Sequence, residues 1–341
     1  PTVKMMTEGR ASNCSIEYYS MDAPSGSSRA VVVKGKSLAR TSQLFPLNDE
    51  GLLVGEGDVD AQITHLLDNL EAVLKEAGSE LDQLVKLNVY VDTPGTVESL
   101  LATLDETLSD GLRPAVTSVV TPLPVEGALL AIDAVAAVDD AVSMGKVELH
   151  QCLDVSRLDD DLADVSVGPW GRLIYFSGQP DKTQPRSEAT NNSLTALLET
   201  AEQLDVEKSQ ILQLKVYIDD PLKADEVLDV INQHFTDQSI PPVVFVKWTA
   251  SAPIEIEMIA HLPVEGMCMA SGQLMFYTPP GVEPSPKFSR VALVQADLIY
   301  IGGLTAQESG DGETQVRDVF SQLESILNET GGDMTHLAKA T

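Results

Sequence analysis

The sequence predicts an α+β protein that repeats one β-β-α-β-α-β-β unit along the chain. The main observation is that residues 81–92 (LDQLVKLNVYVD), a helix exit followed by a strand, recur as residues 208–219 (KSQILQLKVYID). Tyr217 thereby stands 127 positions after Tyr90, and a third copy of the junction begins at Asp333 with DMTHLAKAT. A unit of supersecondary structure that recurs at a fixed spacing indicates a tandem array.

Within the first unit, hydrophobic periodicity and turn residues predict each element. The apolar side chains of residues 60–77 recur with the spacing of an amphipathic helix, and Gly78 supplies its stop. A second helix is predicted over residues 97–108 on the same grounds. Lys34-Gly35-Lys36 is predicted as a turn that pairs the strands on either side of it. The predicted strands are residues 30–34, 37–45, 84–91, 115–120 and 129–138, and residues 46–60 read as a loop.

The later copies keep these positions. Four apolar positions of the first helix reappear 127 residues later, and six reappear 253 residues later, where Gly331 takes the place of Gly78. The sequence therefore predicts an irregular lead-in and three units, the third incomplete. The lead-in is residues 1–14, the units are residues 15–140, 146–262 and 270–341, and a linker is expected over residues 139–145.

The third unit, as far as Thr341, contains its first strands and its first helix but not its later strands. Such a unit has an unpaired sheet edge and an incompletely covered helix, which are costly and prone to aggregation. We therefore expect the natural chain to continue beyond Thr341, with strands supplied by another chain as the alternative.

The composition disfavours polyanionic partners. The formal net charge is −30, from 52 acidic and 22 basic residues. Nucleic acids and anionic membranes are bound mainly through Lys and Arg, so neither is an expected partner. A well-solvated surface or a salt-adapted host accounts for the acidity.

Cysteine, histidine and hydropathy patterns indicate a cytoplasmic protein without a cofactor. Cys14, Cys152 and Cys268 lie over a hundred residues apart, which favours reduced thiols over a disulfide framework or a metal site. The five histidines have no metal-binding spacing, and no phosphate-binding or dinucleotide motif is present. No apolar run approaches the roughly 18 residues that span a bilayer. No signal peptide is visible, although the chain begins at Pro1.

Each unit resembles the RidA family, also called YjgF or the reactive-intermediate deaminases. The residues that carry the resemblance are strand ends, helix-to-strand junctions and final strands. The strand ends are Thr41-Ser42-Gln43, Ser177-Gly178-Gln179 and Ile301-Gly302-Gly303; the junctions are residues 84–92, 211–219 and 337–341; the final strands are residues 131–136 and 254–260. The resemblance covers nearly the whole chain after about residue 15.

The resemblance implies a chorismate-mutase-like fold, in which a mixed sheet carries two helices on one face. Members of this family usually form homotrimers with ligand clefts between neighbouring subunits. Three tandem units therefore resemble that trimer on a single chain, an intramolecular pseudo-trimer whose clefts between units would take a small metabolite.

The resemblance also implies the chemistry to look for, the hydrolysis of enamines and imines. The family's deaminases hold the substrate carboxylate with an arginine in a Pro-Ala-Arg pattern, because a guanidinium matches a carboxylate in a bidentate way. A glutamate on the last strand is thought to position the attacking water. At the arginine positions this chain has Val116 and Val243, and at the glutamate positions it has Ala131 and Glu255. Glu255 is therefore the candidate catalytic residue.

Four other residues are candidate ligand-binding groups, each with a structural alternative. Ser177 and Gly178 would face a ligand from a strand end, although small residues there also serve a turn. Arg113, three residues before Val116, would reach a cleft from another angle or be a solvated loop residue. Arg40 is a further candidate anion-binding group. For Glu255 itself the alternative is an ion pair on the sheet face.

The sequence leaves three hypotheses for the function of this protein. The leading hypothesis is a degenerate member whose clefts bind a small metabolite or serve structure only. The alternative is an active enamine/imine deaminase, which hydrolyses 2-aminoacrylate-type intermediates to 2-keto acid and ammonia. A protein-interaction scaffold is the third. Some relatives have been described as ribonucleases, and the net charge of −30 argues against that activity here.

Overall fold

The structure, a computed structural model, describes most of the chain. The described residues are 15–20, 23–109, 112–138, 146–170, 172–236, 238–249, 251–261, 272–278, 280, 289–307 and 309–340. The expected lead-in over residues 1–14 and the expected linker over residues 139–145 lie outside them.

The three units follow one order of elements, and the bounds of the long elements agree closely with the sequence prediction. The first contains β1 (Ser15–Tyr19), β2 (Ala30–Lys34), β3 (Ser37–Thr41), α1 (Val59–Glu76), η1 (Leu81–Gln83), β4 (Leu84–Val91), α2 (Gly95–Thr107), β5 (Ala115–Val120) and β6 (Leu130–Val138). The second contains β7 (Glu148–His150), β8 (Val165–Gly168), β9 (Leu173–Asp181), α3 (Arg186–Glu202), η2 (Lys208–Gln210), β10 (Ile211–Ile218), η3 (Pro221–Lys223), α4 (Ala224–His234), β11 (Val243–Lys247) and β12 (Ile254–His261). The third contains β13 (Gln273–Tyr277), β14 (Val291–Gln295), β15 (Leu298–Ile301), α5 (Gly312–Glu329) and η4 (Met334–His336).

Equivalent helices begin and end for the same local reasons. The side chain of Asp58 accepts a hydrogen bond from the backbone N–H of Ala61 at the start of α1, and Asp311 does the same for Thr314 at the start of α5. Such caps satisfy backbone donors that have no partner within the helix. Gly78 and Gly331 follow these helices at φ +73° and +85°, a conformation that favours glycine.

The strand pairing corrects one expectation. Lys34-Gly35-Lys36 was expected to pair the strands on either side of it, but β2 and β3 do not pair with each other. β2 pairs with β1 and β15, whereas β3 pairs with β6 and β8. At Gly35, with φ +67°, the chain leaves one sheet and enters the next. The hairpin prediction was wrong because a short turn does not reveal which strands it serves.

As a result, each unit gives its first two strands to the sheet of another unit. The first six-stranded sheet has the order β5-β4-β6-β3-β8-β7, so that the second unit completes the sheet of the first. The second has the order β11-β10-β12-β9-β14-β13, completed by the third unit, and the sheet β1-β2-β15 joins the first unit to the third. The exchange of strands thus closes a ring of three units.

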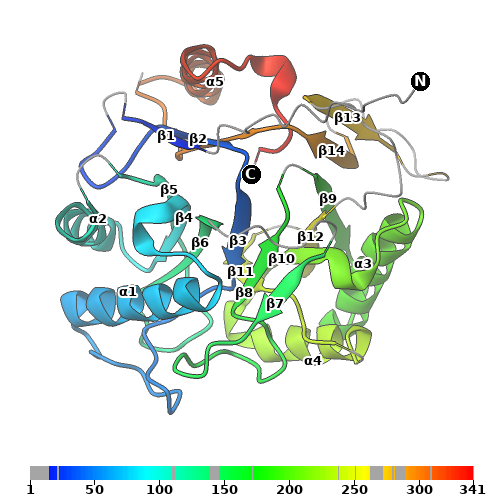
Figure 1. Ribbon diagram of the computed structural model, residues 1–341. Helices are drawn as coiled ribbons and strands as arrows, with labels where there is room; N and C mark the ends of the chain where they lie inside the picture. Colours follow the sequence, from blue (N-terminus) through cyan, green and yellow to red (C-terminus); the bar gives the residue numbers. More distant parts are fainter. Residues whose placement is uncertain are drawn as a thin grey trace, which may run out of the picture.

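Each six-stranded sheet is covered by two helices on its outward face (Figure 1). The first core lies between α1, α2 and the first sheet, and the second lies between α3, α4 and the second sheet. The inward faces form two further apolar clusters, which join residues of different units. The expected α+β architecture, mixed sheets with two helices on one face, is confirmed.

Candidate functional site

The strand end Thr41-Ser42-Gln43 fills the junction between the first and second units, where the family resemblance implies a ligand cleft, and we term this junction the first cleft. Gln43 donates its backbone N–H to the carbonyl of Val243 at 3.0 Å. Its side-chain amide donates to the carbonyl of Phe245 at 3.2 Å and accepts from the N–H of Phe245 at 3.1 Å. All three residues of this strand end are at most 5 % exposed. Gln43 therefore occupies the edge of β11 that would otherwise face the cleft.

The second cleft, between the third and first units, is closed by glycines and by Lys86. Gly302 and Gly303 donate backbone hydrogen bonds of 2.8 Å to the carbonyls of Arg29 and Val116. A Cβ added to Gly303 would lie 3.2 Å from the side chain of Thr117, so only a small residue allows this approach. Lys86 Nζ bridges the two units, donating to Thr117 Oγ1 at 2.5 Å and to the carbonyl of Ile301 at 2.6 Å.

The two valines at the expected arginine positions do not face these clefts. Val243 is buried in the core beneath α3 and α4, and Val116 packs against the core beneath α1 and α2. The inward-facing neighbours are Thr117, which accepts from Lys86, and Val244, which belongs to the cluster shared by the first two units. None of these four positions carries an arginine, so β5 and β11 supply no guanidinium to either cleft.

Glu255 lies in a different setting, on the side of the second unit that faces the third. The site comprises Glu255, Glu257, Tyr217, Gly178 and Lys339, and we term it the Glu255 site. Glu255 and Glu257 are partly buried on β12, opposite Tyr217 and Lys215 of β10. A Cβ added to Gly178 would lie 1.7 Å from Oε1 of Glu255, so the carboxylate rests directly against this glycine.

Lys339 of the third unit completes the Glu255 site. Its Nζ lies 2.6 Å from Glu257 Oε2, and the Tyr217 hydroxyl donates to the same oxygen at 3.3 Å. Burial, and then the neighbouring charge of Glu257, raises the pKa of Glu255, while Lys339 opposes this effect. Burial also raises the pKa of Tyr217, so its phenol remains a neutral donor. In the Glu255 site, Lys339 therefore pairs with Glu257, which also lies opposite Lys215, and Glu255 forms no ion pair among the described residues.

Sequence reasoning missed a buried polar group on the inward face of the first sheet. Asp133, 2 % exposed, accepts from Asn88 Nδ2 at 2.9 Å and from the Tyr90 hydroxyl at 2.7 Å. Burial lowers the pKa of nearby Lys86 to about 7; the charge of Asp133 acts in the opposite direction and that of Lys215 adds to the lowering. Charged or polar residues alternating with apolar ones along β4 were the signal available in the sequence.

The other sequence candidates occupy separate places. The Ser177 hydroxyl donates to the carbonyl of Ser289 at 2.5 Å, a contact that serves the neighbouring strand connection. Arg40 is 1 % exposed on β3, and its Nη2 donates to the hydroxyl of Tyr300 at 3.1 Å. The structure thus brings Glu255 and Gly178 together and separates Arg40 and Arg113 from them.

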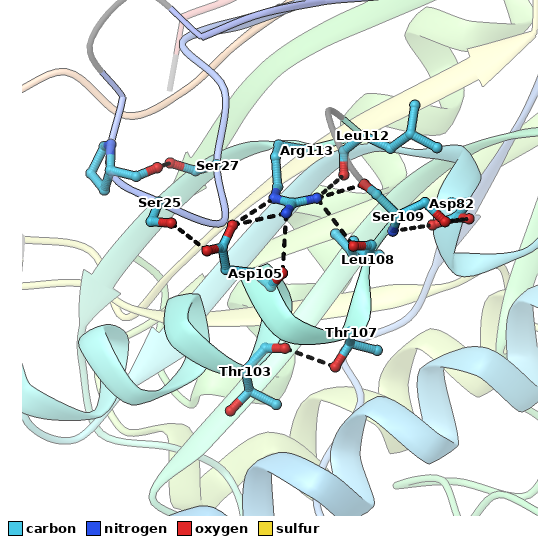
Figure 2. A network of polar contacts seen from close by, with 11 residues as sticks. Ser25, Ser27, Asp82, Thr103, Asp105, Thr107, Leu108, Ser109, Leu112 and Arg113 are labelled. Carbon is cyan, nitrogen blue, oxygen red and sulfur yellow. Dashed lines mark hydrogen bonds and ion pairs between the residues drawn. The ribbon is translucent and has the colours of Figure 1, made fainter.

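Arg113 is held in a network of its own (Figure 2). It forms an ion pair with Asp105, with 2.8 Å between Nη2 and Oδ1, and Ser25 donates to the same carboxylate. Its guanidinium also donates to four backbone carbonyls at and after the end of α2, those of Asp105, Leu108, Ser109 and Leu112. Arg113 therefore stabilises the C-terminal end of α2 and is not directed at a cleft.

Neither a metal cluster nor a membrane span is found in the described part of the chain. There, no group of three or more His, Cys, Asp or Glu side chains is placed to hold a metal ion. Likewise, no helix among these residues is long and apolar enough to cross a membrane.

Comparisons with solved structures match single units of this chain. A conserved Rid-family protein from Yersinia pestis is 26 % identical, covers 36 % of this chain and 98 % of its own length, and has a TM-score of 0.32. A YjgF-family member from Neisseria meningitidis is 23 % identical over 38 % of this chain and 98 % of its own, with a TM-score of 0.28. RidA from a Psychrobacter species is 20 % identical over 32 % and 81 %, with a TM-score of 0.26. No curated protein matches the chain.

The family profile described as Endoribonuclease L-PSP matches the chain twice, over residues 22–138 and 165–262. The two matched segments together span more than half of the 341 residues and lie within the first and second units. They confirm the RidA chorismate-mutase-like fold that the sequence motifs implied. The chain belongs to the endoribonuclease L-PSP (RidA/YjgF) family and carries two matched copies of its domain in tandem.

Proposed function

We propose that this chain is a non-catalytic member of its family. In this proposal, the residues at the first and second clefts hold the ring of three units together, and the Glu255 site binds a small metabolite. One observation carries the proposal. Gln43 occupies the edge of β11 with three hydrogen bonds, whereas Gly303 occupies the equivalent edge of β5 with one and the neighbouring Gly302 donates to the carbonyl of Arg29. Buried polar contacts of this kind fix a close approach of two backbones and leave no room for a substrate.

The charge of the Glu255 site supports an amine as its ligand. Lys339 pairs with Glu257 and not with Glu255, so a ligand with a positive charge or several N–H donors pairs best with the Glu255 carboxylate. A ligand that binds through its own carboxylate would meet like charge from Glu255. The wide spacing of the three cysteines favours reduced thiols and supports a cytoplasmic location.

The test is binding of small primary amines to the full chain. Ethylamine, 2-aminoethanol and putrescine would be titrated calorimetrically into the unsubstituted chain, into Glu255→Gln and into Glu148→Gln, an exposed control outside the site. We expect saturable binding that is lost with Glu255→Gln and kept with Glu148→Gln. Binding that is unaffected by Glu255→Gln would contradict the assignment of the site.

An enamine/imine deaminase is the second candidate, and the raised pKa of Glu255 favours it. A carboxyl whose pKa is raised by burial serves well in proton transfer near neutral pH. The assay is the release of ammonia or keto acid from 2-iminopropionate-type substrates. Turnover that disappears in Glu255→Ala, and persists in Glu148→Gln, would replace the non-catalytic proposal with this one.

A further inference from the structure

A hollow lies where the third strands of the three units meet, away from the Glu255 site. It opens to solvent, and its interior leaves about 10 Å³ for the centre of a water-sized molecule. All three units contribute to its wall: Val33, Lys36, Leu38 and Arg40 from the first, Pro169, Trp170 and Leu173 from the second, and Ala296 and Leu298 from the third. β3, which carries Leu38 and Arg40, runs through the middle of the molecule (Figure 1).

Equivalent positions of β3, β9 and β15 build the hollow in two layers. Strand pairing aligns Leu38, Leu173 and Leu298, which form an apolar ring in the wall. Two residues further along each strand stand Arg40, Tyr175 and Tyr300. Side chains two residues apart in a strand point to the same face. Arg40, Tyr175 and Tyr300 therefore form a polar layer next to the leucine ring.

The polar layer contains one buried positive charge. Arg40 is 1 % exposed, its Nη2 donates to the Tyr300 hydroxyl at 3.1 Å, and its Nη1 has no hydrogen-bond partner in the described part of the chain. Burial raises the pKa of Tyr175, and its contacts with Tyr300 and Arg40 show that all three groups interact. Tyr175 is therefore a neutral phenol, and no described carboxylate forms an ion pair with Arg40.

Such a charge needs a counter-ion. A guanidinium is always protonated in proteins, and burying an unpaired charge costs several kcal/mol. Phenols offer dipoles but no net negative charge. Asp297, on the turn that carries Ala296, is exposed and acts on Lys34 at the surface. Among the described residues the charge of Arg40 is therefore unbalanced, and Arg40 forms part of the wall of a space that a small ion can enter.

We propose that this hollow binds a single monovalent inorganic anion of the size of chloride, held by Arg40 on the axis where the three units meet. The leucine ring offers no donors, so a doubly charged oxyanion would leave several oxygens without partners. A monovalent halide needs only the donors that the polar layer supplies, Arg40 Nη1 and the phenol hydroxyls. Lys36 at the rim adds positive charge along the path of entry. The bound ion would join all three units through one contact point.

The test compares chloride with a monovalent anion too large for the hollow. Thermal unfolding of the full chain would be followed in sodium chloride and in sodium gluconate at equal ionic strength. We expect a saturable rise in melting temperature that is specific to chloride. In Arg40→Met, which keeps an unbranched apolar stem and removes the charge, the chloride-specific rise should vanish, and ³⁵Cl NMR line broadening should fall by at least roughly tenfold.

Two further variants keep the test decisive. Ala296→Phe fills the mouth of the hollow without touching Arg40 and should also abolish the chloride-specific rise. Arg113→Gln removes a different, carboxylate-paired arginine and should leave that rise intact. Equal melting temperatures in chloride and gluconate, or a chloride effect that survives both Arg40→Met and Ala296→Phe, would overturn the proposal. Direct observation is available from bromide anomalous scattering, where a peak beside Arg40 Nη1 is expected.

Discussion

Lys86 makes the stability of this protein depend on pH between neutrality and mild alkali. Burial lowers the pKa of Lys86 from its ordinary value of 10.5 to about 7 in the folded chain. Between these values the unfolded chain binds the proton and the folded chain does not. Stability rises with pH wherever the unfolded state binds more protons, so the free energy of unfolding should increase from pH 7 upward. Below pH 7 both states are protonated and the full penalty of burying the ammonium is present.

The size of the effect follows from the same two pKa values. At pH 7 the folded amine is half protonated, and by pH 8.5 it is almost entirely neutral, while the unfolded amine remains charged throughout. Integration over this window, at 1.36 kcal/mol per unit, gives a gain of roughly 1.5 kcal/mol. The window stops at pH 8.5 because burial raises the pKa of Cys152, whose unfolded thiol ionises above that pH and acts in the opposite direction.

The measurement is the free energy of urea unfolding at pH 7.0, 7.5, 8.0 and 8.5 and constant ionic strength. The original chain should gain stability along this series, whereas Lys86→Met should show no such gain. Lys75→Met is the matched control, because Lys75 is an exposed helix residue paired with Glu71 at 2.7 Å. The reasoning would be refuted by a stability that is flat or falls in the original chain, or by a Lys86→Met variant with the same rise.

Three further substitutions test the site assignments. Gln43→Ala should destabilise the chain by about 2–4 kcal/mol in urea unfolding, because the N–H and C=O of Phe245 lose their buried partner; a loss below 1 kcal/mol would mean that the first cleft is not closed by this residue. Gly178→Ala should displace the Glu255 carboxylate and abolish amine binding in calorimetry, while Gly95→Ala, where an added Cβ meets nothing within 4 Å, should not. Arg113→Gln should lower stability by about 1–2 kcal/mol and leave amine binding unchanged, since its partners cap α2; weaker amine binding would contradict its separation from the Glu255 site.

Sequence reasoning located the elements that are specified locally. The periodic apolar residues of α1 and the left-handed glycine after it are both set within about twenty residues, and the same pair recurs at α5 and Gly331. The strand β4 was also predicted with the bounds observed. Repetition strengthened these assignments, because one pattern was read three times.

Strand partners were not available to the same reasoning. β7 has only three residues, and β1, β7 and β13 carry too short a pattern to be recognised alone. The partner of β2 is β15, more than 260 residues later, so no local signal could identify it. Long-range pairing is fixed by the packing of whole units, and the strand exchange followed only from the structure.

The candidate site was predicted in part for the same reason. Glu255 was predicted as a strand carboxylate that faces a cleft or forms an ion pair on the sheet face, and the structure places it beside Glu257, whose partner Lys339 lies in the third unit. Arg113 resembled a free cation because its acceptors are mostly backbone carbonyls, which carry no sequence signature. Gln43 was noted as part of a motif, and only the structure shows that its amide closes the first cleft.

The exchange of strands also changes how the loss of family residues should be counted. Val243 and Glu255 both belong to the second unit, yet Val243 pairs beside Leu214 and Glu255 beside Tyr217, on opposite sides of β10. Gln43 of the first unit approaches Val243, whereas Lys339 of the third approaches the Glu255 site. Each unit therefore contributes residues to two different clefts. Val243 and Glu255 belong to the same unit but lie at different clefts, so family residues should be compared within a cleft rather than within a unit. Counted by junction, Gln43 bonds to Val243 and Phe245 between the first two units, and Lys86 and Gly303 join the first unit to the third. Between the second and third units, Glu255 lies beside the ion pair of Glu257 with Lys339.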